Sequence, residues 1–147
     1  MSHSLIKIWI HLVFGTKNSE PLIIPKYEKQ LYKHIREKLA KDFECKVNII
    51  NGIADHIHIL FLLSPNYNVS DIVKNIKGES SHWWNNQKFS DFKFAWQIGY
   101  GAFSVSESMI SRVEKYIGNQ KEHHKKVSYH QEVELFMNKY GLKIINR

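Results

Sequence analysis

The sequence predicts an α+β fold with one antiparallel sheet, of the split β-α-β type found in ferredoxin-like proteins. Hydrophobic periodicity alternates between about two and about 3.6 residues, in the order strand, helix, strand, strand, helix, strand. Further helical patterns follow, and one of them carries Tyr116. No internal repeat or linker interrupts the 147 residues. We therefore expect a single domain over residues 1–147, with helices on one face of the sheet and a C-terminal tyrosine helix.

The first half of the chain contains three predicted strands and one helix. Residues 5–14 are rich in strand formers, and isoleucine alternates with other residues at positions 6, 8 and 10, which predicts a strand. Residues 26–42 repeat leucine or isoleucine every four positions, which predicts an amphipathic helix. Residues 46–53 and 55–63 are typical of two further strands, and Asn51-Gly52 is a hairpin or bulge signal near their junction.

The second half returns to helices with one more strand between them. Ser70 is the expected cap of a helix that ends near residues 83–84, where a polar loop begins. Residues 94–104 are rich in strand formers and are bent by glycines. Ser106 and Ser128 are expected to begin the last two helices.

Two histidines occupy the most apolar strand. His56 and His58 are two residues apart and therefore share one face of that strand. A pair of this kind is often just two satisfied side chains on a wet face. The apolar run around and after Ile57 predicts a buried central strand instead, where imidazoles without partners are costly. A metal ion is a suitable shared partner, and by ligand type alone imidazoles favour Mn, Zn, Ni or Cu over Mg.

A tyrosine and a glutamine with helical spacing provide a second pair of functional groups. Tyr116 and Gln120 are four residues apart, so a helix places them on one face. Packing in a core with Val113 and Ile117 explains the tyrosine but leaves Gln120 without a role. A phenol is a poor nucleophile at neutral pH because its pKa is near 10. It becomes competent when it is aligned with a phosphate whose charge a metal neutralises.

Five blocks of sequence together resemble the single-tyrosine HUH transposases of small bacterial insertion sequences, the insertion-sequence-two-hundred-like family. The blocks occur in the family's order and extend from the first strand to the tyrosine helix. They are His11–Lys17, Gly52–Leu60, Val73–Ser81, Phe94–Ser106 and Tyr116–His124.

The resemblance implies a reaction and its machinery. It implies that Tyr116 is the nucleophile and that His56, His58 and Gln120 hold a divalent metal, Mg²⁺ or Mn²⁺. The implied function is a DNA transposase that cleaves and rejoins single-stranded DNA with hairpin structure at the element ends, through a 5′-phosphotyrosine. It also implies a homodimer whose sheets join, with the tyrosine helix able to serve the partner's histidines.

Several neighbouring residues have more than one interpretation. The run from His123 and His124 into two lysines can extend the metal site, but a phosphate-contacting or solvated helix end is the favoured interpretation. Residues 83–84, both tryptophans, can stack on unpaired bases or pack in the core. Asp55 is a candidate to orient a histidine or to shape a turn. His11 is expected to be structural or hydrogen-bonded near the site.

Composition agrees with a folded protein that binds a polyanion. Hydrophobic residues make up 43% and aromatic residues 13%, which excludes a disordered tail. The net charge of +7 favours a polyanionic partner. Cys45, the only cysteine, excludes an internal disulfide and is expected to be buried. The absence of a signal peptide or a membrane-length apolar run predicts a cytoplasmic protein without a membrane partner.

Three other functions are compatible with the same sequence features. A metal-dependent nuclease would use His56 and His58 with an activated water and would not need Tyr116. A single-strand nucleic-acid binder would use the tryptophans and the basic helices, but it leaves the histidine pair unexplained. A transposase relative adopted by its host would keep all of these residues.

Overall fold

The computed structural model describes residues 4–140 and contains one four-stranded antiparallel sheet with the strand order β2-β3-β1-β4. This order and the succession β-α-β-β-α-β confirm the predicted ferredoxin-like fold. The strands are β1 (Trp9–Gly15), β2 (Lys46–Ile53), β3 (His56–Leu62) and β4 (Gly101–Val105). The helices are α1 (Glu28–Phe43), α2 (Val69–Gln87), α3 (Ile110–Gly118), α4 (Gln120–His123) and α5 (Tyr129–Tyr140).

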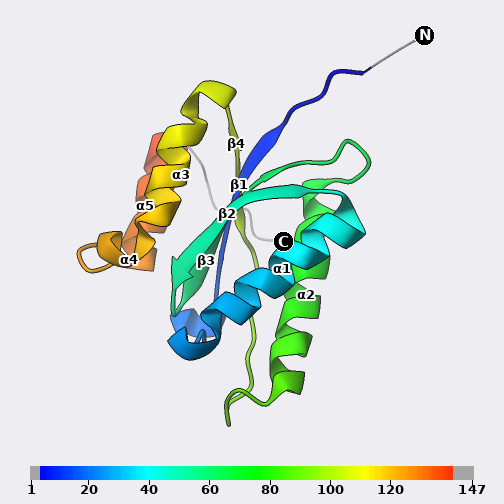
Figure 1. Ribbon diagram of the computed structural model, residues 1–147. Coiled ribbons are helices and arrows are strands. Elements are labelled where there is room, and N and C mark those ends of the chain that lie inside the picture. Colours follow the sequence, from blue (N-terminus) through cyan, green and yellow to red (C-terminus); the bar gives the residue numbers. More distant parts are fainter. Residues whose placement is uncertain (1–3, 141–147) are drawn as a thin grey trace.

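Helices lie on both sides of the sheet. Figure 1 shows α1 and α2 on one side, and α3, α4 and α5 on the other. Short 3-10 turns at Lys17–Ser19, Pro25–Tyr27 and Glu107–Met109 connect these elements. None of the helices within residues 4–140 is long and apolar enough to cross a membrane.

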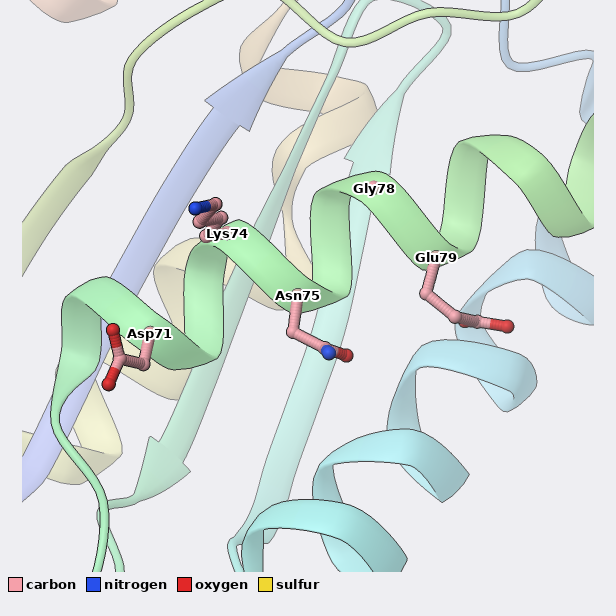
Figure 2. Close-up of a pocket in the computed structure, with 5 residues that line it drawn as sticks. All are labelled: Asp71, Lys74, Asn75, Gly78 and Glu79. Carbon is pink, nitrogen blue, oxygen red and sulfur yellow. The ribbon is translucent and has the colours of Figure 1, made fainter.

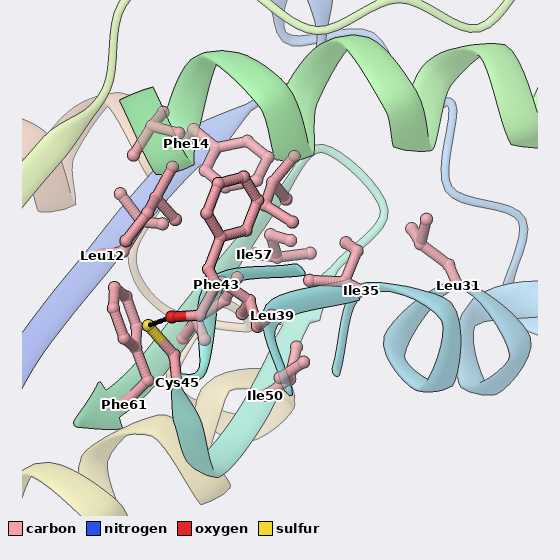
Figure 3. Packing of buried hydrophobic residues seen from close by; sticks show 14 of the residues in the cluster. Leu12, Phe14, Leu31, Ile35, Leu39, Phe43, Cys45, Ile50, Ile57 and Phe61 are labelled. Carbon is pink, nitrogen blue, oxygen red and sulfur yellow. Dashed lines mark hydrogen bonds between the residues drawn. The ribbon is translucent and has the colours of Figure 1, made fainter. Parts of the chain in front are cut away.

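The main hydrophobic core fills the space between the sheet and the α1–α2 layer. Ile57, Ile59 and Phe61 of β3 point into it, and all three are fully buried. They meet leucine, isoleucine and phenylalanine side chains of α1, and Cys45 is buried in the same cluster as expected (Figure 3). Because side chains alternate along a strand, His56 and His58 must point to the opposite face, toward α3 and α5.

Helix α2 is longer than the sequence pattern predicts, and its cap is a different residue. The side chain of Asn68, not Ser70, accepts a hydrogen bond from the backbone N–H of Asp71 at 2.8 Å. An asparagine oxygen serves this position as well as a serine does. The helix continues past the two tryptophans to Gln87, because Trp84 packs in the core and extends the apolar face.

The last strand is shorter than predicted, because the ladder with β1 covers residues 101–105. Before it, Trp96 forms an isolated bridge with Thr16, and the N–H of Gln97 donates to the carbonyl of Gly15. In the segment before β4, side chains form hydrogen bonds with several backbone N–H and C=O groups. Asn85 bonds both the N–H and the C=O of Phe94, and Lys77 donates to the carbonyl of Gly99. These bonds replace a strand ladder, and the positive φ of Gly99, 97°, ends the extended conformation.

The predicted tyrosine helix is broken between its two functional residues. Helix α3 ends at Gly118, and α4 begins at Gln120. Asn51 of β2 donates its side-chain N–H groups to the carbonyls of Ile117 and Gly118, at 2.9 and 3.2 Å. These bonds satisfy the carbonyls at the end of α3 and fix the helix on the sheet.

Candidate functional site

The histidine pair of β3 is buried, and a hydrogen-bond partner at each Nδ1 fixes the orientation of each ring. His56 and His58 have no exposed surface, and their ring centroids are 5.1 Å apart. Nδ1 of His56 lies 2.7 Å from a carboxylate oxygen of Asp55. Nδ1 of His58 lies 2.8 Å from Nε2 of His11 on β1. With both Nδ1 atoms occupied, the two Nε2 atoms are the ones that can bind a further group.

Burial keeps part of this cluster neutral. It lowers the pKa of His11 to about 3 and that of His58 to about 4. A neutral imidazole is the form that binds a metal. The pKa of His56 is raised, because its hydrogen bonds to the carboxylates of Asp55 and Glu132, together with their negative charges, outweigh the opposite effect of burial.

Gln120 is brought to the histidines as predicted. Its Oε1 lies 3.2 Å from Nε2 of His56, and the side chain is fully buried at the start of α4. Its amide nitrogen faces the backbone carbonyl of Tyr116 at 3.5 Å. The break in the helix at Asn119 therefore does not separate the two residues.

Tyr116 lies at the edge of the same cluster. Its ring stands edge-on to the ring of His58, with the centroids 5.6 Å apart. Its hydroxyl donates a hydrogen bond to Oε2 of Glu132 in α5. Burial and this carboxylate raise the pKa of the phenol, because both disfavour a phenolate.

Glu132 lies at the centre of the site, and no pattern in the sequence predicted it there. Oε1 of Glu132 is 2.9 Å from Nε2 of His58 and 3.3 Å from Nε2 of His56. The side chain is almost fully buried. Burial by itself would raise its pKa, but hydrogen bonds from His56, His58 and Tyr116 hold the pKa far below its usual value. Nothing in the local sequence separates Glu132 from the exposed Glu134 one half-turn later.

His124 belongs to this cluster, although the sequence favoured a solvated helix end. Its side chain is only 1% exposed, and its ring centroid is 4.4 Å from that of His56. Among the described residues, neither ring nitrogen has a hydrogen-bond partner. Its Nε2 is 3.2 Å from Oε2 of Glu132, in a charge contact without hydrogen-bond geometry. His123 is a quarter exposed and faces the same carboxylate oxygen at 3.3 Å.

The donor set fits a divalent metal ion. One ligand atom from each of His56, His58, His124 and Glu132 lies within 4.8 Å of the others. Buried imidazole nitrogens without hydrogen-bond partners, as in His124, are suitable free ligand atoms. Imidazole and carboxylate together are common ligands of transition metals. This His–Glu cluster can therefore hold a metal.

The two tryptophans have separate roles. Trp84 is fully buried in the core between Tyr27 and Phe94. Trp83 is partly buried and stacks on His34 of α1, with the ring centroids 4.3 Å apart. Of the two predicted interpretations, core packing is confirmed for Trp84.

A shallow depression on α2 is a poor candidate for the catalytic site. It has a volume of about 360 Å³ and lies along the helix on the side of the sheet away from the histidine pair. Figure 2 shows its lining residues, Asp71, Lys74, Asn75, Gly78 and Glu79. Glu79 is already paired with His34 at 2.6 Å. The groups that could perform chemistry are therefore on the other face.

Comparison with known proteins gives a family match over most of the chain. Residues 4–120 match the family described as Transposase IS200 like. The ISDra2 transposase TnpA of Deinococcus radiodurans is 24% identical over 123 residues, which cover 75% of this chain and 81% of that relative. The matched region contains His56, His58, Tyr116 and Gln120 but ends before α5.

Two solved structures have the same fold. One, from Deinococcus radiodurans R1 and described as a transposase, has a TM-score of 0.64 and 22% identity, and covers 82% of this chain and 95% of its own. The other is a REP-associated tyrosine transposase bound to a REP hairpin. It has a TM-score of 0.63 and 18% identity, and covers 84% of this chain and 74% of its own.

Proposed function

The chain belongs to the IS200-like transposase family, and on this premise we propose that it cleaves and rejoins single-stranded DNA through a 5′-phosphotyrosine. The observation that carries the proposal is the convergence of Tyr116 with His56 and His58. The hydroxyl of Tyr116 and the Nε2 atoms of both histidines contact the two oxygens of a single carboxylate, that of Glu132. A nucleophile and a pair of metal-binding nitrogens are thus within the reach of one small anion.

Each residue then has a defined part in the reaction. His56, His58 and Gln120 would hold Mg²⁺ or Mn²⁺, which supplies neutralisation of the phosphate charge. Asp55 and His11 fix the orientation of the two imidazoles through their Nδ1 atoms.

The chemical step exchanges one phosphate ester for another. The phenolic oxygen of Tyr116 forms a bond to phosphorus while the bond from phosphorus to the 3′-oxygen breaks. The phenol loses its proton, and the 3′-oxygen gains one and leaves as a hydroxyl. The ester energy is kept in the phosphotyrosine, so a 3′-hydroxyl of another strand can reverse the attack and complete a transfer.

The DNA substrate follows from charge and from one relative. The net charge of +7 favours a polyanion. One structural relative is bound to a REP hairpin, which supports a hairpin substrate. We extend this to the present chain, and propose single-stranded DNA with a hairpin as its substrate and a homodimer as the acting form.

Replacing Tyr116 by phenylalanine tests the function directly. Single-stranded DNA from the regions flanking the gene is labelled at its 3′ end, incubated with Mn²⁺ and protein, and run on a denaturing gel. The wild type should give a labelled protein–DNA adduct, because the tyrosine retains the 5′-phosphate of the 3′ fragment. Tyr116→Phe should give neither adduct nor cleavage, whereas Tyr67→Phe, a partly exposed tyrosine before α2, should behave as the wild type. Cleavage that persists in Tyr116→Phe would instead identify a nuclease that uses water.

A further inference from the structure

The carboxylate of Glu132 occupies the place that the proposed reaction requires for the DNA phosphate. A scissile phosphate must touch both the metal held by the histidines and the hydroxyl of the nucleophile. Glu132 is an anion that contacts Nε2 of His58 at 2.9 Å, Nε2 of His56 at 3.3 Å and the hydroxyl of Tyr116. We infer that α5 is a built-in lid, in which Glu132 imitates the scissile phosphate and closes the site until DNA displaces it.

Burial shows that DNA and the docked helix exclude each other. His56, His58 and Gln120 have no exposed surface in the described structure, and Glu132 is 1% exposed. A phosphate of a DNA strand cannot reach groups that are fully covered. Since Glu132 lies on the outer side of the histidine pair, opposite the sheet, a movement of α5 is the simplest way to admit a strand.

The docked position of α5 is built by other contacts as well. The ring of Tyr129 stacks on that of His56, with centroids 4.2 Å apart and planes 13° apart. Gly15 leaves the space for this ring, because a Cβ there would lie 2.6 Å from Cε2 of Tyr129. One turn later than Glu132, Phe136 stands edge-on to His11 with the centroids 5.9 Å apart. These contacts lie along one side of the helix.

Helix α5 also lies outside the residues that match the family. The family match ends at Gln120, and α5 begins nine residues later, at Tyr129. Ser128 starts it with a reciprocal cap, in which Gln131 N–H donates to the serine hydroxyl and Ser128 N–H donates to the glutamine side chain. A helix with its own cap, joined by a short turn, can leave the site as a unit. The catalytic groups proposed above would stay on the sheet, α3 and α4.

The inference rests on the proposed function, and hydrogen exchange tests it without measuring activity. Backbone amide exchange of residues 129–140 is followed by mass spectrometry for the full chain, alone and with a DNA hairpin that carries a single-stranded thymidine tail, in Mn²⁺. Exchange in α5 should rise on DNA binding, because the displaced helix loses its docking contacts. Exchange in β3 should not rise. Unchanged or stronger protection of α5 with saturating DNA would overturn the inference.

The affinity of the same hairpin probe gives a second, independent measurement. Glu132→Gln keeps the side-chain shape but removes the charge that imitates phosphate, and Glu134→Gln is the matched control on the exposed side of α5. In a chelator, so that no strand is cut, Glu132→Gln should bind the probe on the order of tenfold more tightly than the wild type, because a larger fraction of molecules is open. Glu134→Gln should bind as the wild type does.

A third variant opens the lid without touching Glu132. Gly15→Ala places a methyl group against Tyr129 and should likewise tighten binding and increase exchange in α5. If the wild type binds the probe and all three variants bind it with the same affinity as the wild type, the lid inference is wrong and the proposed function stands. If no variant binds DNA at all, the proposed function itself is wrong, and the lid with it.

Discussion

His11 and His58 are hydrogen-bonded ring to ring across neighbouring strands, with 2.8 Å between Nε2 of His11 and Nδ1 of His58. Both rings are buried, and burial lowers both pKa values, so the bond joins two neutral imidazoles. It fixes which nitrogen of His58 faces Glu132. His11 therefore acts on the candidate metal site through His58 and not as a ligand.

This relationship predicts a graded loss of metal affinity. His58→Ala removes a ligand and should abolish Mn²⁺ binding, whereas His11→Phe keeps an aromatic ring but loses the hydrogen bond. Partners of this kind are worth about 10- to 100-fold in metal affinity, so His11→Phe should weaken Mn²⁺ binding by that factor. Titration calorimetry measures both, with the exposed His130→Ala as a control. Equal affinity in His58→Ala and the wild type would refute the metal role.

DNA binding should prefer single strands with a hairpin and should weaken as salt increases. The reason is electrostatic, because lysine and arginine side chains that neutralise phosphates release counterions. Fluorescence anisotropy across a salt series, with a tailed hairpin and a blunt duplex of equal length, measures the preference. An equal affinity for the duplex at each salt concentration would contradict the single-strand substrate.

Gly52 should be intolerant of any side chain, because β3 lies too close. A Cβ at this position would lie 2.1 Å from the backbone oxygen of His56 and 2.8 Å from the Cα of Ile57. The backbone of β3 would have to shift, and overpacking of this kind costs about 1–3 kcal/mol or more. Gly52→Ala should therefore lower the free energy of unfolding in a urea titration, and should weaken Mn²⁺ binding because His56 moves with the strand.

Gly78 in α2 provides the matched control for Gly52. A Cβ there meets nothing within 4 Å, so alanine adds no clash. Gly78→Ala should raise the free energy of unfolding by about 0.5–1 kcal/mol, because alanine favours the helix interior. If Gly52→Ala and Gly78→Ala change the free energy of unfolding in the same direction, the close approach of β2 and β3 is not the cause of the change in Gly52→Ala.

The proposed homodimer has a testable surface near the start of β1. Leu5, Ile6 and Ile8 are exposed, with Leu5 at 97%, and they precede the strand that pairs with the edge strand β4. Exposed apolar side chains that lie close together in the chain are typical of an interface. Light scattering at micromolar concentration should give the mass of two chains for the wild type. Leu5→Asp combined with Ile6→Asp should give the mass of one, and a wild type of single-chain mass would contradict the dimer.

The sequence by itself determined the parts of the site that depend on local periodicity. The alternation of a strand requires His56 and His58 to share a face, and helical spacing keeps Tyr116 near Gln120 even though the helix is interrupted between them. The alternating order of strands and helices likewise determined the fold. Local patterns of this kind do not change when distant segments come together.

Only the tertiary structure decided which distant side chains complete the site. His11 lies in β1, His124 at the end of α4, and Glu132 in α5. Each of them meets the β3 histidines through packing between elements. A helical pattern shows that α5 has faces, but not which face meets another element, so Glu132 and Glu134 look alike in the sequence. Glu132 is the buried one because Tyr129 stacks on His56 and Gly15 leaves space for the tyrosine ring. These contacts exist only in the folded chain.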